Sequence, residues 1–187
     1  MRAAAGAISS VRAAEGRLVA HVLGGGPARG ICGSGLVDAV ARGLELGRIE
    51  PSGRLAGGGS VLELQDGLAL TQRDIRELQL AKGAIRTGID MLLDVTGVSL
   101  EGLARIRLAG NFGSGLDIRK TIRLGLIPPL PVERVDVVGN AALRGAALAL
   151  VSREYRERAA RVHRSCRFLE LAARPDFQMR FASSLFF

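Results

Sequence analysis

The chain has 187 residues, a length that fits one domain and leaves little room for a second. Apolar residues make up 48% of it, which is enough for a hydrophobic core and excludes a disordered protein. The 25 glycines follow no triplet period, so a collagen-like chain is excluded. No apolar run approaches the roughly 18 residues of a membrane-spanning helix. We expect one soluble, cytoplasmic domain over 1–187 with no membrane contact, ending in a helix and tail at about 151–187.

The formal net charge of +8 comes almost entirely from arginine, because only Lys82 and Lys120 are lysines among 26 basic residues. The arginines are scattered and aromatic residues are only 4%, whereas nucleic-acid surfaces combine basic patches with aromatic side chains. A compositional bias of the genome explains the charge, and we expect no nucleic-acid partner. Two cysteines, Cys32 and Cys166, are too few for a disulfide framework or an iron–sulfur cluster with four thiolates.

The first part of the chain carries signals for short strands around one helix. Residues 17–23 have the pattern of a strand and lead into a glycine-rich segment, which is followed by a helix from about Leu36 to Leu46. Residues 57–70 predict two extended runs joined at Asp66-Gly67, a dipeptide typical of hairpin turns.

A long helix is predicted next. Thr71 is a plausible N-cap, Asp74 three residues later resembles a capping box, and Gly97 is a typical helix end. One face collects apolar residues at helical spacing, and the opposite face is expected to be polar. The expected apolar face consists of Ile75, Leu78, Ile85, Ile89, Leu92 and Leu93, and the polar face carries Gln79, Lys82 and Arg86.

Strands and helices then alternate. Residues 104–109 predict a strand, 117–124 a helix and 135–138 a second strand, after which Asn140 caps a long Ala/Leu helix. Strands joined by a helical crossover pair in parallel, and loops at their carboxyl ends form the usual ligand crevice. Both strands end in Gly/Asn loops, so we expect a site there. The basic stretch 153–167 is expected to be a solvated helix face.

Two loops are candidates for ligand binding. The first, Gly30 to Gly35 with the sequence GICGSG, precedes a helix, so its amides and the helix dipole suit a phosphate. A tight strand-to-helix turn explains the same glycines equally well. Cys32 in this loop fits a small buried hydrophobe better than a nucleophile, because the sequence shows no recognisable base for it.

The second candidate loop runs from Gly110 to Gly115 and follows a predicted strand. Its small residues would let a flat ring lie against the backbone, and Asn111 could hydrogen-bond that ring. The alternative is a glycine-rich turn with Asn111 in the left-handed region.

The order of these pieces resembles the second half of the actin-like, ribonuclease-H-like ATPase fold, which sugar kinases, acetate kinases, seventy-kilodalton chaperones and actin share. The resemblance implies an α/β lobe built on a mixed sheet with helices on both faces. Gly110 stands at the first glycine of the adenosine loop and Asn111 replaces the second. Residues 141–147 match the Ala-rich helix of that fold. Lys82, three residues after Gln79, stands where the chaperones place a lysine that grips the nucleoside.

The amino-acid sequence is similar to one branch of this fold in particular, the reductive activators of corrinoid proteins. The segments MRAAAGAI, GICGSGLVDAV, LTQRDIRELQLAKGAIRTGI, LAGNFGSGLD, VGNAAL and RPDFQMRF carry this resemblance in order along residues 1–187. In that family a ferredoxin domain precedes the ATPase-like region, and ATP drives reduction of inactive cobalt(II) corrinoid to cobalt(I). The resemblance therefore implies ATP and Mg as cofactors and a corrinoid protein as partner.

The resemblance also implies which residues hold the nucleotide. They are Gly33, Ser34, Gly35, Gln79, Lys82, Arg86, Gly110, Asn111 and Gly113. Lys82, Asn111 and the Gly33–Gly35 loop are then expected to face one crevice. The Asp-containing phosphate and magnesium loops and the four-cysteine ferredoxin loop of the family are not in this sequence, so we expect a C-terminal fragment. The alternative is a module that no longer uses nucleotide and binds a corrinoid protein or a second copy of itself through exposed apolar surface.

Overall fold

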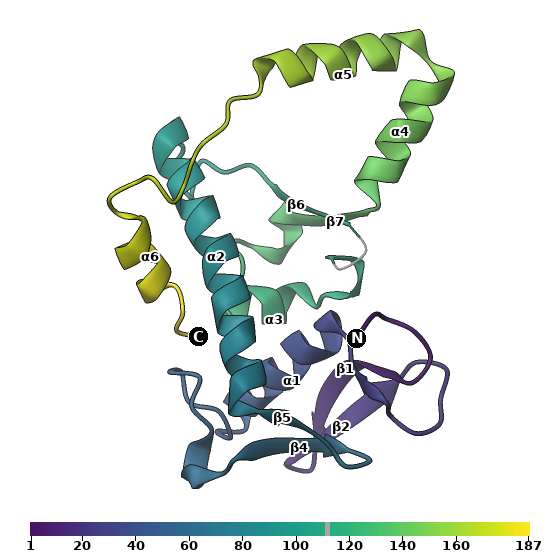
Figure 1. The fold of residues 1–187 in the computed structure, drawn as a ribbon, viewed down its shortest axis with the longest axis vertical. Coiled ribbons are helices and arrows are strands. Elements are labelled where there is room, and N and C mark those ends of the chain that lie inside the picture. The colour runs from purple at the N-terminus through teal and green to yellow at the C-terminus, as the bar shows by residue number, and fades with distance from the viewer. Residues whose placement is uncertain (111–112) are drawn as a thin grey trace.

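The computed structural model of the chain describes residues 1–110 and 113–187 and confirms the α/β class. The strands form three small sheets, of which the first is mixed, where we expected one mixed sheet. In the first sheet the middle strand pairs antiparallel with one neighbour and, over two residues, parallel with the other (Figure 1). The strands are β1 (Ala7–Ala14), β2 (Arg17–Val22), β3 (Gly30–Ile31), β4 (Val61–Gln65), β5 (Leu68–Thr71), β6 (Ile106–Ala109) and β7 (Val135–Gly139).

Strand β1 is central to its sheet, and the sequence analysis did not predict it. Ala7, Ile8 and Val11 are buried, but the rest of the strand is mostly small or exposed. Alanines and an arginine therefore obscure the alternation of polar and apolar residues that identifies a half-buried strand. Residues 17–22 form β2 as expected, and the chain turns between the two strands at Glu15 and Gly16, which both have positive φ.

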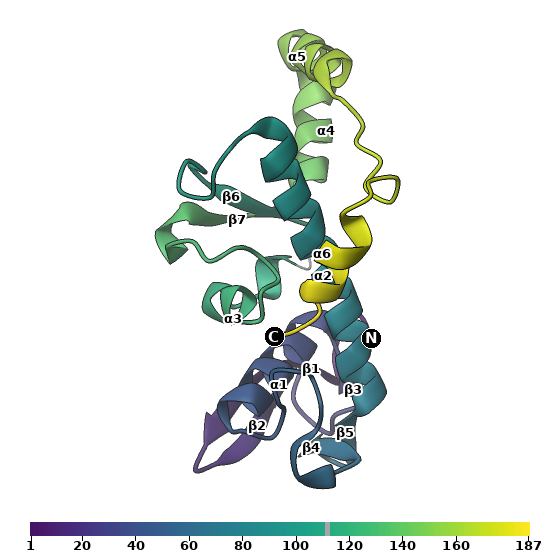
Figure 2. The ribbon, with the colours of Figure 1, turned by 90° about the vertical axis from the view of Figure 1, so that its left-hand side faces the viewer.

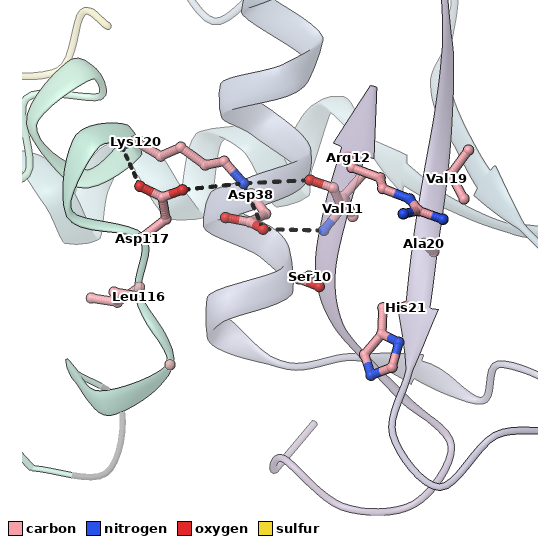
Figure 3. Close-up of a pocket in the computed structure, with 11 residues that line it drawn as sticks. Ser10, Val11, Arg12, Val19, Ala20, His21, Asp38, Leu116, Asp117 and Lys120 are labelled. Atoms are coloured by element: carbon pink, nitrogen blue, oxygen red, sulfur yellow. Dashed lines mark hydrogen bonds and ion pairs between the residues drawn. The ribbon is translucent and has the colours of Figure 1, made fainter. Parts of the chain in front are cut away.

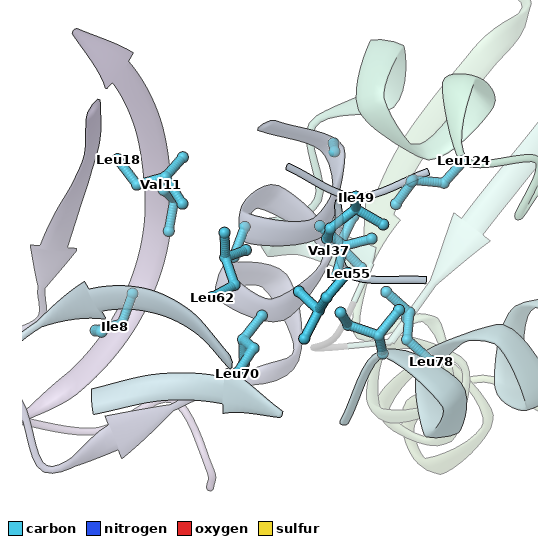
Figure 4. Packing of buried hydrophobic residues seen from close by; sticks show 14 of the residues in the cluster. Ile8, Val11, Leu18, Val37, Ile49, Leu55, Leu62, Leu70, Leu78 and Leu124 are labelled. Atoms are coloured by element: carbon cyan, nitrogen blue, oxygen red, sulfur yellow. The ribbon is translucent and has the colours of Figure 1, made fainter. Parts of the chain in front are cut away.

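The largest hydrophobic core surrounds the first helix. Val37 and Val40 of this helix are fully buried, and they pack in one cluster with residues of β1, β4, β5 and the start of α2 (Figure 4). This helix begins at Gly33, three residues before the predicted start. The helices are α1 (Gly33–Glu45), α2 (Gln72–Thr96), α3 (Ile118–Arg123), α4 (Ala141–Val151), α5 (Arg153–Ser165) and α6 (Phe177–Ser183).

The ends of α2 are where the sequence placed them. Thr71 accepts a hydrogen bond from the Asp74 amide, the Asp74 side chain accepts one from the Thr71 amide, and Gly97 ends the helix in the left-handed region. The β4–β5 hairpin turns at Asp66 and Gly67, also as predicted.

The predicted apolar face of α2 is only partly buried. Ile75 and Leu78 are buried as expected, but Ile85 and Leu92 on the same face are 45% and 51% exposed. Gln79 and Lys82, on the face expected to be polar, are 0% and 2% exposed. The reason is that α6 and the C-terminal residues pack along α2 and cover the side that carries Gln79 and Lys82 (Figure 2).

Strands β6 and β7 pair in parallel as predicted, with Ile106 opposite Val135. Helix α3 lies between this pair and α1, and Asp117 caps it (Figures 1 and 2). Asn140 caps α4, and Ser152, the one residue between α4 and α5, caps α5, which continues at an angle to α4. The two helices extend away from the rest of the molecule, and neither has a buried residue. Among the described residues, no helix is long and apolar enough to cross a bilayer.

The capping box makes a first test. We predict that Thr71→Ala lowers the free energy of unfolding by about 1 kcal/mol, because the Asp74 amide loses its acceptor. The Thr71 hydroxyl and amide hydrogen bonds lower the pKa of Asp74, so this contribution is present at neutral pH and is lost as pH falls through that pKa. Urea unfolding followed by circular dichroism at pH 7 measures it. Arg76→Ala, an exposed substitution on the same helix, serves as the control.

Candidate functional site

The structure brings the two predicted glycine loops together. Gly33 begins α1, and residues 113–115 form a single 3-10 turn after β6. A Cβ atom at Gly115 would lie 3.2 Å from both Cβ and Oγ of Ser34. A crevice of about 430 Å³ opens at this contact, and it is lined by Met1, Arg2, Ala3, Cys32, Gly33, Ser34 and Gly115.

The start of α1 has features suited to an anion. Its N-cap residue, Cys32, makes no side-chain capping hydrogen bond, and the first turn contains no acidic residue. The first amides of a helix lack intrahelical acceptors and carry the positive end of the helix dipole. The Ser34 hydroxyl is held in place, since it donates to the Ser9 carbonyl over 2.9 Å and lies 3.3 Å from the Cys32 sulfur. Cys32 is buried, as expected of a small hydrophobe.

Packing alone demands one of these glycines. A Cβ atom at Gly35 would overlap the carbonyl oxygen of Ile8 in β1. Close packing of α1 on β1 therefore explains Gly35. The tight turn with positive φ that the sequence offered as an alternative is not found, because neither Gly33 nor Gly35 has a positive φ.

The second loop is only partly described. Gly110 has a φ of +100°, and its amide donates to the Gly139 carbonyl over 2.7 Å, which joins the ends of β6 and β7. A Cβ atom at Gly113 would lie 3.3 Å from the Leu108 side chain. Asn111, which the sequence analysis assigned to the adenine ring, lies outside the described residues.

The structure does not bring Gln79, Lys82 and Arg86 to this crevice, because none of the three lines it. The Gln79 amide group donates to the carbonyls of Ser52 and Leu185, over 3.0 and 2.9 Å. The Lys82 ammonium donates to the Phe186 carbonyl. These contacts make Gln79 and Lys82 anchors for the C-terminal residues.

The last residue completes this anchor. The Phe187 amide donates to the Pro51 carbonyl over 2.9 Å, and its ring centroid lies 5.4 Å from the Lys82 nitrogen. Burial, together with the nearby Arg86 guanidinium, lowers the pKa of Lys82 from 10.5 to about 8. Arg86 itself pairs with Asp90 over 2.9 Å on the same helix.

A second cavity, of about 580 Å³, adjoins the crevice and shares Gly115 with it (Figure 3). Two charged groups that the sequence analysis missed lie at its base. The Lys120 ammonium of α3 lies 2.8 Å from the Asp38 carboxylate of α1, and both residues are buried. The signals in the sequence were an aspartate among the apolar residues of α1 and the rarity of lysine. Among the described residues, no group of three or more His, Cys, Asp or Glu residues could hold a metal ion.

Comparison with known proteins identifies the family of the chain. Residues 1–187 match the family described as the C-terminal domain of RACo, the ASKHA domain. The chain belongs to this family. The ASKHA match agrees with the α/β fold and with the predicted resemblance to actin-like ATPases.

Relatives of this ASKHA domain carry names that refer to corrinoid proteins. A solved structure, the reductive activator for corrinoid, iron-sulfur protein, matches with a TM-score of 0.87 and 33% identity, over 100% of this chain and 33% of that one. The corrinoid activation enzyme RamQ of Eubacterium limosum is 32% identical over 95% of this chain and 34% of its own length. The [Co(II) methylated amine-specific corrinoid protein] reductase of Methanosarcina barkeri is 32% identical over 61% and 21%. The chain thus spans about a third of RamQ and of the solved activator.

The buried lysine of this ASKHA domain gives a second test, the replacement Lys82→Met. Below pH 8 both folded and unfolded states are protonated at Lys82, and the folded state bears a buried charge. Between pH 8 and the ordinary lysine value of 10.5 the folded state has lost this proton while the unfolded state keeps it. Hence we predict that the unfolding free energy of the wild type rises with pH there, by at most about 1.4 kcal/mol per pH unit.

Urea unfolding at several pH values between 7.5 and 10 measures this slope. The Lys82→Met variant is predicted to lose the rise, since methionine keeps the apolar stem and has no titrating group. Equal slopes in the two proteins would contradict the burial of a titrating Lys82.

Proposed function

We propose that this chain is the nucleotide-binding lobe of a protein that uses ATP to reactivate corrinoid proteins by reducing cobalt(II) to cobalt(I). The observation that carries the proposal is the contact between two glycine loops, 33–35 and 113–115, at one crevice. The family match over the whole chain and the names of the relatives support the corrinoid part of the proposal.

Residues in and beside the crevice would bind different parts of the nucleotide. The amides of Gly33, Ser34 and Gly35 at the start of α1 would donate hydrogen bonds to phosphate oxygens, and Arg2, which lines the crevice, would supply positive charge. Gly110 and Gly113 would let the base approach the backbone. Gln79 and Lys82 have no part in this proposal, because their donors are engaged by the C-terminal residues.

The residues of the crevice fit phosphate but not magnesium. Mg²⁺ binds through carboxylates, phosphates and water, and the crevice is lined by no described carboxylate. The magnesium that the family resemblance implies would therefore depend on groups outside this crevice. The electron that reduces cobalt must also come from elsewhere, because one buried and one exposed cysteine cannot hold an iron–sulfur cluster with four thiolates.

A second candidate function rests on a different surface. Helices α4 and α5 form an arm without a buried residue, and on it Leu150 and Val151 are each 81% exposed. Exposed apolar surface of this kind marks interaction sites. This favours a module that binds a protein partner, such as a corrinoid protein or a second copy of itself, without using nucleotide.

Titration of ¹⁵N-labelled protein with ATP, followed by amide chemical shifts, tests the first function. We predict saturable shifts centred on residues 33–36 and 113–116, with a dissociation constant between about 0.1 and 1 mM, because a single lobe supplies few phosphate contacts. Gly115→Val is predicted to weaken binding at least tenfold, since a side chain there meets Ser34 and fills the crevice.

Gly145→Val is the matched control, because Gly145 lies on α4 with open space around it, and it should bind ATP like the wild type. No saturable shift in the wild type would leave only the interaction module. Shifts confined to the α4–α5 arm would contradict ATP binding at the two glycine loops.

A further inference from the structure

The buried ion pair between Asp38 and Lys120 joins the elements that carry the two loops. Asp38 lies in α1, one helical turn after Ser34, and Lys120 lies in α3, five residues after Gly115. Asp38 and Lys120 are only 6% and 8% exposed, so solvent screens their charges weakly.

Both charged groups also hold the main chain of β1 at Val11. The Val11 amide donates to Asp38 Oδ2 over 3.1 Å, and Lys120 Nζ donates to the Val11 carbonyl over 3.4 Å (Figure 3). Asp117, at the start of α3, lies 3.8 Å from the same ammonium. Three elements, α1, α3 and β1, thus meet at one ion pair.

Ser34 and Asp38 attach consecutive turns of α1 to β1. They are four residues apart on the helix, a rise of about 6 Å, and they bond Ser9 and Val11 of β1. These two contacts lie next to an irregularity in the pairing of β1 with β2, between Ile8 and Ser10. Asp38 therefore fixes how far α1 slides along β1, and with it the position of Ser34.

Lys120 fixes the other loop in the same way. The chain between Gly115 and Lys120 is short, and the Asp117 side chain that accepts amide hydrogen bonds at the start of α3 holds it in one conformation. Drawing Lys120 onto Asp38 therefore draws residues 113–115 toward Ser34, which is where the crevice forms.

We infer that Asp38 and Lys120 are positioning residues, which set the separation of loops 33–35 and 113–115 and thereby the affinity for ATP without touching the nucleotide. In its ATP part the inference rests on the proposed function, whereas the separation of the loops does not. Two variants remove one partner each, Lys120→Met and Asp38→Asn. Asp94→Asn is the control, because it breaks an ion pair between α2 and α6 far from the loops.

Two measurements are made on each protein, amide hydrogen exchange by mass spectrometry and ATP titration. Both variants are expected to exchange at least fivefold faster at residues 33–36 and 113–124, with unchanged exchange in the second half of α2. They are also expected to bind ATP at least fivefold more weakly. Asp94→Asn is expected to show neither effect in the loops. Wild-type exchange in the loops of both variants would overturn the inference, and so would wild-type ATP affinity together with faster exchange.

Further variants separate positioning from general stability. Lys120→Arg keeps the charge and is expected to retain more ATP affinity than Lys120→Met. The double variant Asp38→Leu/Lys120→Met removes both charges, which restores stability in many buried pairs. We expect it to regain the melting temperature but not the ATP affinity, and recovery of both would overturn the inference. If the wild type binds no ATP, the proposed function fails, and the exchange rates of the loops alone decide on the ion pair.

Discussion

The close approach of α1 to β1 is the constraint on which the rest of the structure depends. Gly35 permits it, because any side chain there would overlap the Ile8 carbonyl. With the helix this near, Val37 and Val40 reach the core, and Ser34 and Asp38 reach the main chain of β1. The hairpin β4–β5 and the start of α2 then cover the remaining sides of α1 through Leu62, Leu70, Ile75 and Leu78 (Figure 4). Candidate site and core are consequently parts of one packing arrangement.

The two lysines show why a chain rich in arginine keeps a different cation at two positions. Both are buried, and each donates to a main-chain carbonyl from a distant part of the sequence, Phe186 for Lys82 and Val11 for Lys120. An ammonium is compact and places its charge at one point, whereas a planar guanidinium needs room for five donors. The rarity of lysine thus marked two buried cations, whose partners in the structure are main-chain oxygens and, for Lys120, the Asp38 carboxylate.

Local signals in the sequence predicted most elements correctly. The capping box at Thr71, the turn at Asp66-Gly67 and the helix end at Gly97 each depend on residues within four positions, and each is confirmed. The parallel pairing of β6 with β7 followed from the crossover helix between them. Strand β1 was not predicted, because its extended conformation depends on contacts with β2, β3 and α1. Its own residues, mostly small or exposed, do not show it.

Tertiary contacts also decided which predicted site residues meet. Helical spacing correctly put Gln79 and Lys82 on one face of α2, but it could not show that the last three residues of the chain would cover that face. The absence of a side chain at Gly83 admits this packing, since a Cβ atom there would lie 3.0 Å from Leu185. For the glycine loops, the sequence could indicate the residue types, whereas their contact at Ser34 and Gly115 depends on α1 and α3 being held together.

The core around α1 and the α4–α5 arm are stabilised to different degrees, and the candidate site lies between them. Around α1 many side chains are fully buried, whereas α4 and α5 have no buried residue and depend on each other and on their caps. Helices of 11 and 13 residues are marginal in water without tertiary packing, so the arm opens at a lower free energy than the body. The arm begins directly after Gly139, whose carbonyl accepts the Gly110 amide. This hydrogen bond joins the end of β7, which leads into the arm, to the loop that the proposed nucleotide would contact.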